Sequence, residues 1–91
     1  MKNFTARTQS GKTYQSNDGL LTVMNRVGFP IAQFEPLTFR NVDRNREYNS
    51  LNDLILSSPV AEVPEVGKAI YVAGMNDWRL STPITELEVH A

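Results

Sequence analysis

The chain contains no cysteine, so apolar packing and hydrogen bonds must hold its fold together. This excludes a disulfide framework, a thiol nucleophile and a thiolate metal site. The length of 91 residues predicts one domain, residues 1–91, with a modest core, because a small domain leaves much of its surface in water. Its 41% hydrophobic and 21% charged residues are typical of a globular chain. We therefore expect marginal stability unless copies associate, and we predict a homo-oligomer.

The sequence has no apolar run of the roughly 18 residues that a membrane-spanning helix needs. Residues 1–7 also lack the apolar stretch of a signal peptide. We therefore expect no membrane association and a cytoplasmic location.

Two segments of the N-terminal third show clear periodicity. Phe4, Ala6 and Thr8 alternate with polar residues, which indicates a strand, and the turn dipeptide at 10–11 leads into a second extended stretch. These patterns predict a β-hairpin over residues 3–15. A short amphipathic helix is predicted over 19–27, since its apolar residues share one arc at 100° per residue and Gly28 suits the position after a helix.

The rest of the chain divides into short segments. Residues 31–34 and 37–42 are predicted to be extended on either side of Pro36, and the polar residues 40–49 to form a loop. Ser50 and Asp53 resemble a capping box, which predicts a second helix over 51–57. An ordered connector (59–68), a hairpin of strands 69–73 and 78–81 with a turn at 74–77, and a final strand through Leu87 and Val89 are expected to follow.

The fold class predicted from these segments is α+β. We expect a small antiparallel sheet, or a partly open barrel, of about five to seven strands, with two short helices packed on one face.

The charges are unevenly distributed along the chain. Residues 1–50 carry seven Lys and Arg against four Asp and Glu, whereas residues 51–91 carry two against six. This asymmetry is compatible with a basic patch, with head-to-tail association between copies, or with pairing of the two halves inside one fold.

A cluster of arginines is the most unusual feature of the sequence. Arg40, Arg44 and Arg46 lie within seven residues of one another, and guanidinium groups bind phosphate and carboxylate through paired hydrogen bonds. Phe39 and Tyr48 flank the cluster and are candidates for stacking on a base, and Lys12 and Tyr14 are candidates to join from the first hairpin. The alternative is a solvated loop whose arginines pair with local acids.

Trp78 and Arg79 form a second candidate site, a cation–π or base-stacking platform after the turn at 74–77. The alternative, which we favour for Trp78, is a place in the core, since a small core needs large apolar side chains.

Several chemistries are not expected. Residues 9–13 resemble a phosphate-binding loop, but Ala6 stands where that motif needs glycine and no long helix follows, so we predict a simple turn. His90 is the single histidine and lies next to the last residue, a poor position for a general base or metal ligand. We therefore expect no enzymatic activity and no cofactor. A pI near 5.7 also argues against strong binding of duplex nucleic acid.

Two stretches, residues 8–14 and residues 67–84 (Gly67 to Val72 leading to Trp78 to Ile84), resemble short phage-encoded accessory proteins of the anti-defence type. That resemblance implies a non-catalytic protein that binds a host protein or sequesters a nucleotide signal. Together with the arginine cluster it predicts a binding module for an anionic, nucleotide-like ligand. The alternatives are a protein inhibitor of a host defence complex, of the anti-CRISPR kind, and a homomeric structural component.

Overall fold

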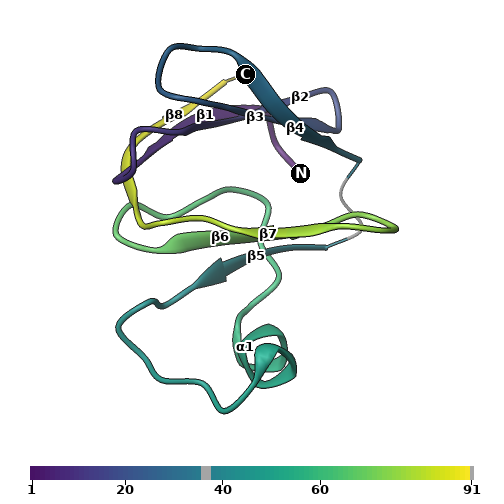
Figure 1. Ribbon diagram of the computed structural model, residues 1–91, viewed down its shortest axis with the longest axis vertical. Coiled ribbons are helices and arrows are strands. Elements are labelled where there is room, and N and C mark those ends of the chain that lie inside the picture. Colours follow the sequence, from purple (N-terminus) through teal and green to yellow (C-terminus); the bar gives the residue numbers. More distant parts are fainter. Residues whose placement is uncertain (36–37, 91) are drawn as a thin grey trace.

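The computed structural model describes residues 1–35 and 38–90, which form two antiparallel sheets and one helix (Figure 1). The first sheet has five strands in the order β4-β3-β2-β1-β8, and the second has three in the order β5-β6-β7. Pro36 and Leu37, for which an interruption and an extended segment were predicted, lie outside the described residues.

The five-stranded sheet is a meander that the last strand completes. Four consecutive strands pair as neighbours, and β8 then pairs with β1, with Phe4 opposite Val89 and Arg7 opposite Glu86. The hairpin predicted over 3–15 is confirmed by the first two strands. The strands are β1 (Phe4–Thr8), β2 (Thr13–Asn17), β3 (Leu20–Met24), β4 (Pro30–Phe34) and β8 (Ile84–Val89).

The helix predicted over 19–27 is wrong, because β3 occupies most of that segment. Asp18 and Gly19 both have positive φ, 50° and 84°, as a type I′ hairpin turn between β2 and β3 requires. The strand alternates as well, since Leu21 and Val23 are fully buried and the residues beside them are only partly covered. Asp-Gly is a strong hairpin signal, and here it forms the turn between two strands rather than the start of a helix.

The three-stranded sheet contains β5 (Thr38–Val42), β6 (Ala69–Ala73) and β7 (Trp78–Leu80), with β6 in the centre. The predicted hairpin over 69–81 is therefore confirmed. The predicted loop over 40–49 is partly wrong, since Arg40, Asn41 and Val42 belong to β5.

The helix predicted over 51–57 is confirmed as α1 (Leu51–Ser57). The Ser50 side chain caps it by accepting a hydrogen bond from the backbone N–H of Asp53, at 3.1 Å. The backbone N–H of Asn49 and the hydroxyl of Ser57 donate to the Asp53 carboxylate and lower its pKa. These bonds hold the loop before α1 against the helix.

Apolar side chains pack on both faces of the three-stranded sheet. Ile70 and Val72 point into the space between the two sheets, where they join a buried cluster with Phe4, Tyr14 and Leu21. Ala69 and Tyr71 point to the other face and pack with Leu54 of α1. Because successive strand residues alternate between faces, β6 is buried on both sides.

The predicted α+β class is therefore corrected. The described residues form a mostly β protein with eight strands, one helix and two packed sheets, and they do not close into a barrel. Two helices were predicted and one is present in the described part of the chain, because residues 20–24 form strand β3 instead of a helix. The chain passes from the first sheet to the second between β4 and β5, and it returns to the first between β7 and β8.

Candidate functional site

The connections between strands gather at two ends of the molecule, because consecutive strands run in opposite directions (Figure 1). The turns at 9–12, 25–29 and 81–83 lie at one end, which contains Lys12 and Arg26 and which we call the basic end. The turns at 18–19 and 74–77 lie at the other end with residue 35. This end contains Asp18, Glu35 and Asp77, and we call it the acidic end.

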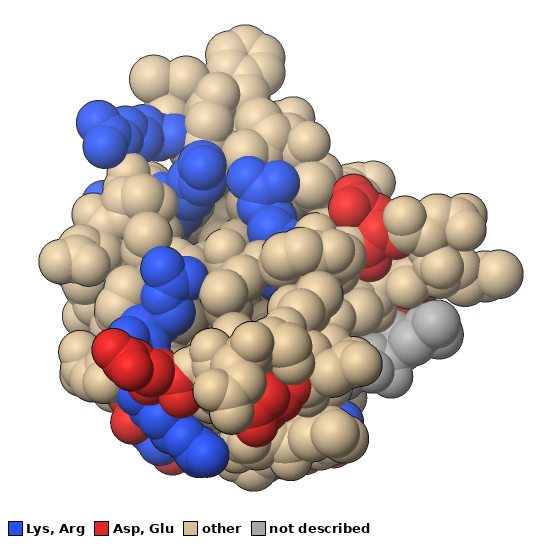
Figure 2. All heavy atoms as spheres, turned by 60° about the horizontal axis from the view of Figure 1, so that its bottom comes forward, with Lys and Arg blue, Asp and Glu red and all other residues tan. Residues whose placement is uncertain are grey.

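A cavity of about 200 Å³ lies at the basic end, between the β1–β2 turn and β7. We call it the basic cavity. Its described lining includes two cations, several hydroxyl groups and no carboxylate. Figure 2 shows Lys and Arg side chains on the left of one face, around a shallow hollow, with Asp and Glu side chains beside the lowest of them. The lining residues are Thr8, Ser10, Lys12, Tyr14, Arg79, Leu80, Ser81 and Thr82.

Arg79 reaches the basic cavity because of its strand position. It lies opposite Val72 in the β6–β7 register, and Val72 points into the space between the sheets. Paired residues share a face, so Arg79 also points inward, towards the hydroxyl of Tyr14. Burial raises the pKa of Tyr14, and the nearby charge and hydrogen bond of Arg79 partly offset that rise. Tyr14 is therefore a neutral neighbour of Arg79 at the back of the cavity.

Lys12 and Arg26 lie beside each other on the outer side of the first turn. Both line a second hollow of about 360 Å³, which shares Ser10 and Lys12 with the basic cavity. The Nε of Arg26 donates to the carbonyl oxygen of Ser10 at 2.7 Å. Arg26 was not among the residues we predicted, since the helix expected at 19–27 gave no reason to place it beside Lys12.

Gly11 leaves room for the side chain of Arg26 beside the first turn. Its φ is +89°, and a Cβ at this position would lie 2.9 Å from Cγ of Arg26. Gly19 has a similar φ of +84° but open space around the corresponding position. Gly11 is thus needed for both its backbone conformation and its contact with Arg26, and Gly19 for its conformation alone.

We predict that Gly11→Ala destabilises the protein more than Gly19→Ala does. Both changes place a side chain in the left-handed region, which costs about 1–2 kcal/mol. Only Gly11→Ala must also displace Arg26. Urea unfolding of the two variants measures the difference, and Arg26→Ala should remove most of it. Equal losses in both variants, with or without Arg26, would show that the contact is unimportant.

Arg44 lies near the rim of the basic cavity. Its Nη1 donates to the carbonyl oxygen of Ser81, a lining residue, at 3.3 Å, and its side chain is otherwise exposed. Of the three clustered arginines, Arg44 is therefore the one that the structure connects to Lys12 and Arg79.

Arg40 and Arg46 face elsewhere. Arg40 lies opposite Tyr71 on the face that α1 covers, and its Nη1 donates to the carbonyl oxygen of Ser58 at 2.7 Å.

The guanidinium carbon of Arg46 lies 5.2 Å from the ring centroid of Tyr48, whose hydroxyl donates to the carbonyl oxygen of Asp43. Phe39 is buried in the core, so it cannot stack on a ligand. The three arginines that are close in the sequence therefore do not form one site, and only Arg44 lies near the basic cavity.

Trp78 is half exposed rather than buried in the core as we expected. It lies opposite Ala73 on the face that carries Tyr71, and the two aromatic rings are 6.0 Å apart between centroids. As neighbours in a strand, Trp78 and Arg79 point to opposite faces, so the structure does not bring them together as a platform.

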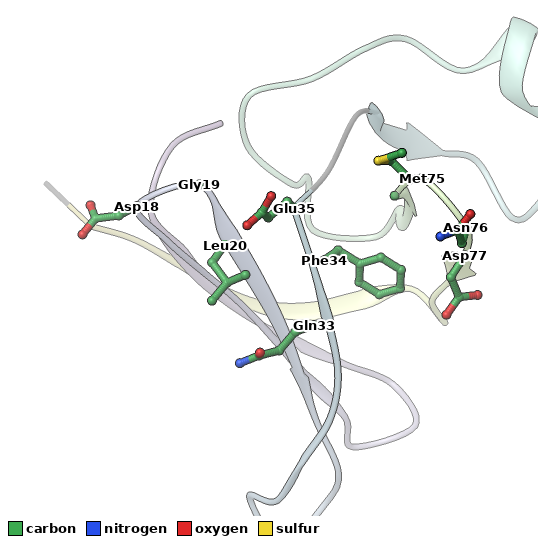
Figure 3. Close-up of a pocket in the computed structure, with 10 residues that line it drawn as sticks. Asp18, Gly19, Leu20, Gln33, Phe34, Glu35, Met75, Asn76 and Asp77 are labelled. Atoms are coloured by element: carbon green, nitrogen blue, oxygen red, sulfur yellow. The ribbon is translucent and has the colours of Figure 1, made fainter.

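A hollow of about 670 Å³ lies at the acidic end (Figure 3). We call it the acidic hollow. Its described lining has three carboxylates and no Lys or Arg, and includes the apolar Phe34 and Met75. Asp18, Glu35 and Asp77 lie apart along it and do not converge on one point (Figure 3). An anionic ligand would be repelled here, so this hollow is not the predicted anion site.

The described residues contain no group of three or more His, Cys, Asp or Glu side chains placed to hold a metal ion. No helix among them is long and apolar enough to cross a membrane.

The fold and the basic cavity together define a small protein of two packed β-sheets with a cationic recess at one end. No family model, curated protein or solved structure matches the chain.

Proposed function

We propose that this protein is a non-enzymatic binding module that holds a phosphoryl or similar anionic group of a small molecule in the basic cavity. The observation that carries the proposal is the convergence of Lys12 and Arg79 on one recess whose described lining lacks any carboxylate. Ser10 and Thr82 add hydroxyl groups on the same lining, and such groups donate to phosphate oxygens.

The charge balance around the recess supports an external anion as the partner. Ion pairs among the described residues join Glu62 to the N-terminus, Glu65 to Lys68 and Glu88 to His90, so none of them involves Lys12, Arg44 or Arg79. These cations lie close together within a chain whose net charge is −1. A bound anion would relieve the repulsion between them.

The size of the cavity limits what it can hold. At about 200 Å³ it is smaller than the roughly 300–1,000 Å³ of typical small-molecule pockets, and it suits a phosphoryl group rather than a whole nucleotide. The remainder of a larger ligand would lie in the adjoining hollow beside Arg26. Tyr14 is 1% exposed, and Tyr48 and Trp78 lie on another face, so a base stacked on an aromatic ring is left out of the proposed complex.

Titrations with inorganic phosphate and with ADP, followed by amide chemical shifts in two-dimensional NMR, test this function. A ceiling of about 1.5 kcal/mol per non-hydrogen atom restricts inorganic phosphate to micromolar affinity at best. We expect saturable shifts of Ser10, Lys12 and Thr82, and a Kd at least about tenfold higher for Lys12→Gln, since a hydrogen bond to a charged group contributes about 1.5–3 kcal/mol.

Arg7→Gln is the matched control, because Arg7 is exposed on the outer face of the five-stranded sheet, opposite Glu86. It should leave the Kd unchanged. Absence of saturable shifts with both ligands, or equal weakening by Lys12→Gln and Arg7→Gln, would overturn the proposal. The resemblance to phage-encoded accessory proteins, inhibition of a host defence complex and a structural role in a homomeric assembly stay predictions.

A further inference from the structure

We propose that copies of this chain associate head to tail, with the loop at 25–29 of one copy seated in the acidic hollow of the next. This inference goes beyond anion binding and does not depend on it. It rests on two complementary features at opposite ends of the molecule: an exposed apolar loop beside cations, and a large hollow with carboxylates on an apolar floor.

The loop at 25–29, which we call the tip loop, presents apolar side chains to solvent. Val27 is 79% exposed and Phe29 is 69% exposed. Arg26, from the same loop, and Lys12 line a hollow together with Val27. A loop that carries both an exposed aromatic residue and an arginine is typical of an interface, since these side chains contribute strongly to binding.

The tip loop is held in one conformation by its own hydrogen bonds. The Oδ1 of Asn25 accepts from the backbone N–H groups of Val27 and Phe29, at 3.1 and 2.9 Å. The backbone N–H of Asn25 donates to the carbonyl oxygen of Phe29 at 2.8 Å. Because the loop is already ordered, docking would require little further loss of conformational entropy.

The acidic hollow has the properties that such a loop requires. Its volume of about 670 Å³ lies within the roughly 300–1,000 Å³ range of sites that enclose a ligand. Leu20, Phe34 and Met75 give it apolar surface, and Met75 is 86% exposed. Asp18, Glu35 and Asp77 supply negative charge that attracts Arg26 and Lys12 of another copy. The apolar residues would then be covered on both sides of the contact.

The placement of the two features determines the symmetry. A head-to-tail contact joins the tip loop of one copy to the acidic hollow of the next, which are two different surfaces, so it is heterologous. A docked pair still has one free tip loop and one free hollow. Such contacts generate a ring if the rotation closes and an open filament if it does not.

Sedimentation velocity over a range of concentrations at low salt tests the proposal. Wild-type protein should form species heavier than the 10.2 kDa monomer, and the charge contribution should weaken at high salt. Phe29→Ala removes the apolar anchor of the tip loop, and Glu35→Lys makes the hollow repel Arg26. Each variant alone should sediment as a monomer.

A mixture of the two variants gives the sharpest result. Phe29→Ala retains an intact hollow and Glu35→Lys retains an intact tip loop, so the mixture should form a pair and no larger species. Arg7→Glu and Glu86→Lys, charge reversals on the outer face of the five-stranded sheet, should associate like wild type.

Wild-type protein that remains monomeric at millimolar concentration and low salt would overturn the proposal, and so would a dimer of fixed mass that neither variant disrupts. Glu35→Lys should still bind phosphate, and Arg79→Gln, which changes the basic cavity but no residue of the tip loop, should still associate. Failure of one proposal can therefore be told apart from failure of the other.

Discussion

Replacing Phe4 with alanine is expected to lower the free energy of unfolding by about 3–5 kcal/mol, the usual loss for a buried phenylalanine. Phe4 is fully buried, and its ring lies 5.7 Å from that of Phe39 between centroids. These rings come from β1 and β5, so the contact joins the two sheets. Because domains of this size have a total stability of only about 5–15 kcal/mol, the variant should be substantially unfolded well below the wild-type melting temperature.

Urea unfolding followed by near-ultraviolet circular dichroism measures this loss. Phe29→Ala is the matched control, since it makes the same chemical change at a side chain that is 69% exposed. At micromolar concentration it should change stability by less than about 0.5 kcal/mol. A similar small effect at Phe4 would mean that the space between the sheets is not the core of the protein.

Replacing Ser81 with alanine is expected to lower the free energy of unfolding by about 1–3 kcal/mol, although it removes only one oxygen atom. The Ser81 hydroxyl accepts from the backbone N–H of Ile70 at 2.8 Å and donates to the carbonyl oxygen of Thr82 at 2.7 Å. Both Ser81 and Ile70 are buried, so the variant leaves the Ile70 N–H without a partner and away from water. These bonds form where the chain leaves β7 for β8, so the connection between the sheets should loosen.

Thermal unfolding of Ser81→Ala and Thr85→Ala makes the comparison. The Thr85 hydroxyl also donates to a backbone carbonyl, that of Arg7 at 3.2 Å, but it is exposed and water replaces it. Thr85→Ala should therefore be nearly neutral. Hydrogen exchange of the Ile70 amide should accelerate in Ser81→Ala alone, and unchanged exchange there would contradict the assigned role.

Local signals in the sequence predicted much of the fold. Alternation and a turn dipeptide were sufficient for the first hairpin, and Ser50 with Asp53 was sufficient to place α1 at residues 51–57. They failed at 20–24, where Leu20 and Met24 are partly covered on the face opposite Leu21 and Val23. A strand with apolar residues on both faces does not alternate, so its pattern resembles that of a short helix.

The candidate site was harder to predict because it depends on long-range pairing. Lys12 and Arg79 meet because the two sheets pack on each other, and sequence spacing contains no sign of this. The alternation of side chains along a strand, however, could have been used to place Trp78 and Arg79. Had residues 78–80 been treated as a strand throughout, Trp78 and Arg79 would have been placed on opposite faces, and only Arg79 would have been assigned to the cavity.

The pairing of the last strand with the first affects how the protein folds during synthesis. The strands within residues 4–34 are joined by short turns and need only each other to pair, but β1 has no partner along its other side until residues 84–89 have been made. An open strand edge readily recruits strands from other molecules. Chains released before β8 is made should therefore aggregate, even though most of the core residues are already present.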